Sequence, residues 1–91
     1  MINDNINNTI TRIRRMEEIF DVLTAGIREK PLKINEDLLA ILIDYYENGE
    51  WLHDFEIDEA GFLPSDLKRG VLSEDGVYNL LEEIRETFQT E

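Results

Sequence analysis

Apolar residues recur every three or four positions along the first third of this chain, and this spacing restricts the possible folds more than any other feature. The stripe contains Ile6, Ile10, Ile13, Met16, Phe20, Leu23 and Ile27. At about 100° per residue these side chains share one face of a helix. The sequence therefore predicts an amphipathic helix over residues 4–28, whose end is marked by Gly26 and the downstream Pro31.

Two further segments have helical spacing. Residues 36–47 follow Asn35, a favourable N-cap, and their apolar side chains cover about 200° of the circumference, as in a helix that is contacted on two sides. Residues 74–88 follow Ser73, another favourable N-cap, and have a narrower apolar stripe. We therefore expect a central second helix and a third helix that docks by one edge.

The segment between these two helices, residues 49–72, shows neither a sustained helical period nor a clean alternation. It is nevertheless too rich in apolar residues for a loop without structure. We expect an ordered connection with a short helix over residues 51–58 and a turn over residues 65–68.

The expected fold class is all-α, with three principal helices (about 4–28, 36–47 and 74–88) and a long ordered connection. A chain of 91 residues has room for one small domain, and the absence of cysteine excludes a disulfide. We expect a single domain over residues 1–91, in which the asparagine-rich residues 1–8 are a flexible lead-in.

The net charge of −12 is unevenly distributed. Residues 1–33 are close to neutral, whereas residues 34–63 contain nine acidic residues and no basic one. The overall charge repels other polyanions, so we expect neither direct nucleic-acid binding nor a membrane partner. Within the molecule, either the acidic middle forms a solvated face or the arginines of the first segment face it.

Export and membrane insertion have no support in the sequence. The opening residues lack the basic stretch and apolar run of a secretory signal. The longest apolar run, residues 38–43, is far shorter than the ~20 residues of a membrane span. Together with the absence of cysteine, these features favour a cytoplasmic location.

Catalytic chemistry is also weakly supported. His53 is the only histidine, and without cysteine the usual zinc ligand sets are missing. We expect no catalytic residue, no cofactor and no metal ligand. The enzyme alternative that stays open is a divalent-metal site made by Glu17 and Asp21 together with acids of residues 54–59.

Residues 50–78 form the densest segment, with one tryptophan, three glycines and an isolated Lys68-Arg69 pair among carboxylates. The basic pair is expected to neutralise neighbouring acids. The functional alternative is a recognition patch with Trp51, because tryptophan and arginine anchor many interfaces. This candidate interaction patch has eight members: Trp51, Asp54, Asp58, Glu59, Asp66, Lys68, Arg69 and Asp75.

Three stretches of the chain resemble a family of small bacterial proteins, mainly from Firmicutes, that is catalogued only as a domain of unknown function. These stretches are RMEEIFD at residues 15–21, EWLHDFEIDEAGFLP at 50–64 and DLKRGVLSEDGVYNLL at 66–81. The resemblance implies a stand-alone, cytoplasmic, mainly helical protein, and it brings no known activity.

The sequence favours a non-catalytic protein–protein interaction module over an enzyme. The expected partner is a protein of unknown identity, and a homodimer through the first helix is a subsidiary prediction. Two alternatives stay open. One is the metal-dependent carboxylate site, and the other is an acidic mimic of nucleic acid that binds a basic protein.

Overall fold

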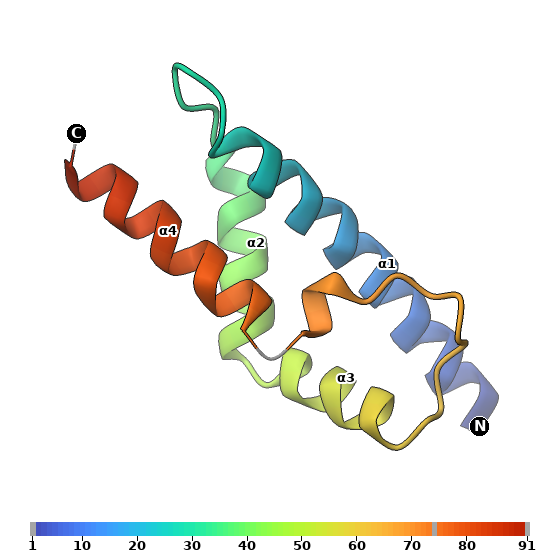
Figure 1. Ribbon diagram of the computed structural model, residues 1–91. Coiled ribbons are helices and arrows are strands. Elements are labelled where there is room, and N and C mark those ends of the chain that lie inside the picture. Colours follow the sequence, from blue (N-terminus) through green and yellow to red (C-terminus); the bar gives the residue numbers. More distant parts are fainter. Residues whose placement is uncertain (1, 74, 91) are drawn as a thin grey trace.

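The computed structural model describes residues 2–73 and 75–90, and every regular element in these ranges is a helix (Figure 1). Four are α-helices and one is a short 3-10 helix: α1 (Ile2–Gly26), α2 (Glu36–Glu47), α3 (Glu50–Glu59), η1 (Gly70–Leu72) and α4 (Gly76–Thr90). The all-α prediction is confirmed. We refer below to residues 60–73, which include η1, as the connection.

The ordered segment predicted over residues 49–72 is confirmed in its main parts. The short helix expected over residues 51–58 is α3, which begins one residue earlier. The expected turn at residues 65–68 closes where the Leu67 N–H donates to the Pro64 carbonyl at 3.2 Å. The 3-10 helix η1 follows this turn and was not predicted.

The ends of α1 differ from the prediction by two residues. The helix begins at Ile2 and ends at Gly26, and the flexibility expected for residues 1–8 stays a prediction. The Lys33 N–H donates to the Gly26 carbonyl, so the following loop folds back onto the helix end. A Cβ at position 26 would lie 2.0 Å from the Lys33 carbonyl oxygen, and this close approach explains the glycine.

Asn35 caps α2 as expected, since its side chain accepts a hydrogen bond from the Leu38 N–H at 3.1 Å. The corresponding prediction for Ser73 is wrong. The Ser73 hydroxyl donates to the Gly70 carbonyl at the end of η1, and α4 begins only at Gly76. The 3-10 turn leaves that carbonyl close to the serine, so the hydroxyl closes η1 instead of opening α4. Residue 74, the predicted helix start, lies outside the described residues.

The core lies where α1, α2 and the connection meet. Its buried apolar residues are Ile13, Met16, Ile19, Leu23, Leu42, Tyr45, Leu63, Leu67, Val71, Leu72, Val77, Leu80 and Ile84. Four of them belong to the connection, which passes from the end of α3 back along α1 and leads into α4 (Figure 1). The connection is therefore part of the core. Within the described ranges, no helix has the length and apolar character needed to cross a membrane.

Candidate functional site

A buried carboxylate joins the first three α-helices. Asp54 on α3 is 0% exposed, and it accepts hydrogen bonds from the Arg12 guanidinium of α1 and the Tyr45 hydroxyl of α2. The Arg12 Nε–Oδ2 distance is 2.9 Å, and the Tyr45 hydroxyl lies 2.7 Å from the same oxygen. The hydrogen bond to Asp54 raises the pKa of Arg12 above its ordinary value. The bonded partners offset the cost of burying the carboxylate.

The Tyr45 phenol should resist ionisation while the protein is folded. Burial, and then the hydrogen bond to Asp54, raise its pKa well above the ordinary value of 10.0. A raised folded-state pKa gives stability that is complete below the unfolded pKa and is lost as the pH rises above it. We expect stability to fall above about pH 10, and the phenolate absorbance of Tyr45 to appear only on alkaline unfolding. An absorbance titration of the wild type and of Tyr45→Phe isolates the Tyr45 signal by difference. A Tyr45 phenolate signal in the folded protein near pH 10 would contradict a raised pKa of Tyr45.

Val71, at the centre of η1, is held by side chains from two helices. Its N–H donates to Glu17 Oε1 of α1 at 3.0 Å, and its carbonyl accepts from Trp51 Nε1 of α3 at 2.8 Å. Glu17 is itself buried, and a Cβ at Gly70 would lie 3.1 Å from its other carboxylate oxygen. Both backbone groups of a fully buried residue are thereby satisfied, as buried backbone requires.

Arg69 organises the first half of the connection. Its guanidinium forms an ion pair with Asp58 at the end of α3 and donates to the carbonyls of Pro64 and Leu67. One side chain therefore fixes the turn at residues 64–67 and ties it to α3. The sequence-based expectation that the basic pair neutralises neighbouring acids is confirmed for Arg69 with Asp58.

The eight residues of the predicted patch fall into two groups. Four have partners inside the fold: Trp51, Asp54, Asp58 and Arg69. The other four are exposed: Glu59 at the end of α3, Asp66 on the connection, Lys68 on the connection in an exposed ion pair with Asp21, and Asp75 just before α4. In the first group, Asp54 joins the first three α-helices and the other three residues hold the connection, and within the second group Asp66 and Lys68 line the same pocket.

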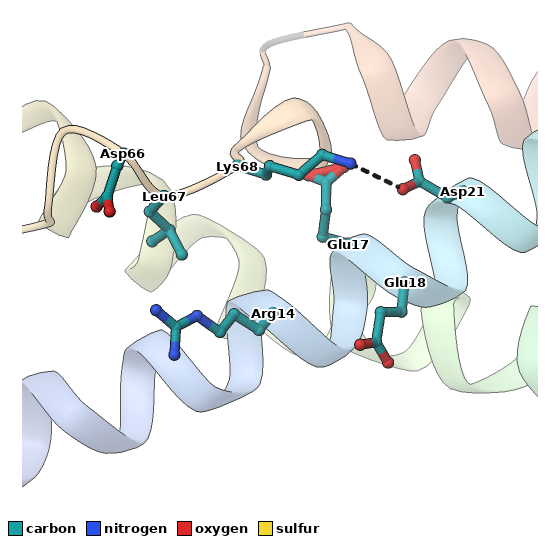
Figure 2. Close-up of a pocket in the computed structure, with 7 residues that line it drawn as sticks. All are labelled: Arg14, Glu17, Glu18, Asp21, Asp66, Leu67 and Lys68. Atoms are coloured by element: carbon teal, nitrogen blue, oxygen red, sulfur yellow. Dashed lines mark hydrogen bonds and ion pairs between the residues drawn. The ribbon is translucent and has the colours of Figure 1, made fainter.

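That pocket is open, has a volume of about 350 Å³ and lies between α1 and the connection (Figure 2). Its lining residues are Arg14, Glu17, Glu18, Asp21, Asp66, Leu67 and Lys68, and we call it the α1–connection pocket. Lys68 Nζ reaches Asp21 Oδ2 at 3.5 Å across the opening. Since both side chains are largely exposed, this ion pair adds little stability.

Three charged side chains at this pocket, those of Arg14, Glu18 and Asp66, make no hydrogen bond or ion pair within residues 2–73 and 75–90. The Arg14 guanidinium is turned away from Glu18, although the two residues are one helical turn apart (Figure 2). Sequence reasoning selected Asp66 but missed Arg14 as a site residue. The only sequence signal for Arg14 was its place in the cluster Arg12, Arg14 and Arg15, and this signal does not distinguish the exposed Arg14 from Arg12, which bonds Asp54.

The structure does not assemble the metal site considered from the sequence. Glu17 is bonded to the Val71 N–H, Asp21 faces Lys68, and Asp54 is held by Arg12 and Tyr45 elsewhere in the fold. Among the described residues, no group of three or more histidine or acidic side chains is arranged to hold a metal ion. The carboxylates are instead used as acceptors for arginine, lysine, tyrosine and backbone N–H groups.

These features define a small all-α domain in which a core-forming connection is tied to the helices by Glu17, Trp51 and the Arg69–Asp58 ion pair. The chain belongs to a family described as a domain of unknown function (DUF4298), whose model matches residues 13–90. No significant match was found among curated proteins or among solved structures. The family match agrees with the predicted membership of a family without an assigned activity.

Proposed function

We propose that this protein is a non-catalytic protein–protein interaction module of the cytoplasm. The observation that carries the proposal is the different use of buried and exposed charges. The buried acids Glu17 and Asp54 both accept hydrogen bonds from other parts of the chain and so stabilise the fold. The exposed charges of the α1–connection pocket include three that have no partner in the described chain: Arg14, Glu18 and Asp66.

The surroundings of this pocket suit recognition. Val22, four residues after Glu18 on α1, is 52% exposed and offers an apolar contact beside the charged side chains. An apolar anchor with a polar rim is the usual composition of a protein interface. The unpaired charges of both signs favour a partner segment that carries complementary charges at the same spacing.

Affinity capture from a lysate of the native cells tests this proposal. Arg14→Glu and Asp66→Lys reverse charge at the α1–connection pocket, and the matched control Glu56→Lys reverses charge at an exposed site on α3. We expect the wild type and the control to retain a stoichiometric protein partner that both pocket variants lose. Circular dichroism checks that all variants are folded. Equal retention by all four proteins, or no stoichiometric partner, would contradict the proposal.

A homodimer through α1 stays a prediction. The apolar stripe of that helix is largely used within the monomer, where Ile13 and Leu23 are fully buried. A second copy would therefore meet Val22 and the exposed arginines of α1. Light scattering coupled to gel filtration measures the mass directly, and a species of 10.7 kDa at every concentration removes the dimer.

A further inference from the structure

A second hollow lies between α2 and α4, which cross obliquely in Figure 1 so that the end of α4 lies apart from α2. It consists of two adjoining depressions of about 240 and 270 Å³ that share Glu47, Leu81 and Arg85. We call it the α2–α4 groove. Its apolar floor contains Leu39, Ile43, Leu81, Ile84 and Phe88.

The second half of α4 leaves part of its apolar side uncovered. Val77 and Leu80 are buried near η1, whereas Phe88 is 46% exposed and Leu81 is only half-buried. Leu81 and Phe88 are seven residues apart and so lie on one face of the helix. This face and the facing side of α2 present a continuous apolar strip that the described chain does not cover. Contiguous exposed apolar surface of this kind marks interaction sites.

The walls of the α2–α4 groove are acidic. Helix α2 contains four carboxylates and no basic residue, and α4 contains three carboxylates and one arginine. At about 100° per residue, Glu36 and Glu47 follow the groove on the α2 side, and Glu82 borders it on the α4 side, whereas Glu83 and Glu86 lie on the far side of α4. The single cation, Arg85, is neutralised by Glu82 at 2.9 Å.

This charge distribution decides between the possible occupants. A second copy of the chain docking through the same groove would bring the acidic α2 walls of two copies, Glu36 and Glu47 on each, to one interface, where they repel each other. A basic partner gains attraction along the α2 wall and apolar contact along the floor. The groove spans Leu39 to Glu47 on α2, a rise of about 12 Å, which fits roughly two to three turns of a docked helix.

We propose that the α2–α4 groove binds an amphipathic helix of a partner protein, with apolar residues at i, i+3 or i+4, and i+7 and with lysine or arginine on the flank that faces α2. The inference rests on the proposed function and adds the chemistry of a partner. Groove-bound helices of this type combine apolar anchors with flanking charges. Leu81 and Phe88 receive the anchors, and Glu36 and Glu47 on the α2 wall orient the basic flank.

The test uses a synthetic leucine–lysine peptide of about 14 residues with this spacing. The control peptide has the same composition in an order that breaks the apolar stripe. Calorimetric titration of the full chain is expected to show the amphipathic peptide binding at least about tenfold more tightly than the control. Phe88→Asp should weaken binding about tenfold, whereas Leu52→Asp, an equally exposed apolar site on α3, should leave it unchanged.

Three results would overturn the proposal. The first is equal affinity for both peptides. The second is binding that disappears with added salt and is unaffected by Phe88→Asp, which indicates attraction by charge alone, as in an acidic mimic of nucleic acid. The third is a dimer in light scattering that Phe88→Asp dissolves. The capture experiment uses the α1–connection pocket, so failure of the groove proposal is distinguishable from failure of the interaction-module proposal.

Discussion

Replacing Asp54 with alanine is expected to lower the free energy of unfolding by about 3 kcal/mol or more, because breaking a buried ion pair leaves its partner uncompensated. The carboxylate is fully buried and accepts hydrogen bonds from both Arg12 and Tyr45. Alanine leaves the guanidinium and the phenol without this acceptor and frees three helices from a common link. Urea denaturation followed by circular dichroism measures the loss, and an unchanged denaturant slope shows that the transition stays two-state.

Two comparisons make this result specific. Glu56→Ala changes an exposed acid on the same helix and is expected to stay within about 0.5 kcal/mol of the wild type. The double variant Arg12→Met with Asp54→Leu replaces both charges with apolar side chains, and it should be more stable than Asp54→Ala because no charge is left unpaired. An Asp54→Ala protein as stable as Glu56→Ala would show that the network does not hold the helices together.

The long helices were predictable because the information for them is local. The three- and four-residue spacing fixed the extent of α1 to within two residues, and Asn35 and Gly26 marked helix ends through cap and turn chemistry. The start of α4 was predicted wrongly because the Ser73 hydroxyl can serve either of two roles, capping α4 or closing η1. Ser73 suits an N-cap, but η1 brings its hydroxyl to the Gly70 carbonyl, and sequence pattern carries no sign of a three-residue 3-10 helix.

For the contacts between helices, the sequence indicated the types of residue that could meet but not the individual residues. The charge map left two alternatives open, a solvated acidic face or arginines of the first segment that face the acidic middle, and the ion pair of Arg12 with Asp54 agrees with the second. It did not identify which of three clustered arginines turns inward. Arg12 lies seven residues before Ile19, which is absent from the predicted apolar stripe and is buried in the structure. The buried face of α1 is therefore rotated toward Arg12 relative to the predicted face.

The candidate site shows a further limit of residue types as evidence. Tryptophan, arginine and aspartate anchor interfaces between proteins, and the same chemistry anchors one segment of a chain to another. Trp51 and Arg69 were members of the alternative recognition patch, and in the structure they hold the connection against α3. Only burial and the location of the acceptor distinguish the two uses. Exposed residues such as Arg14 are consequently better probes of binding than Trp51, whose removal disturbs the fold.

Glu17 shows most clearly that residue type alone does not reveal a structural role, because its partner is a backbone N–H 54 positions away. Glu17→Ala is expected to cost about 2 kcal/mol of unfolding free energy, the usual range for a lost hydrogen bond to a charged group. The Val71 N–H is left buried without its acceptor, so its hydrogen exchange should become faster. Chemical denaturation gives the energy, and exchange followed by nuclear magnetic resonance gives the location.

The location of the effect links the fold to the proposed function. Val71 anchors the connection, and the same connection carries Asp66 and Lys68 to the α1–connection pocket. Faster exchange in Glu17→Ala should therefore extend over residues 66–72 and leave α2 protected as in the wild type. Glu17→Gln is the matched control, since its amide oxygen still accepts from Val71 and should preserve most of the protection. Uniform loss of protection across all helices would mean that Glu17 stabilises the domain as a whole and does not anchor the pocket wall.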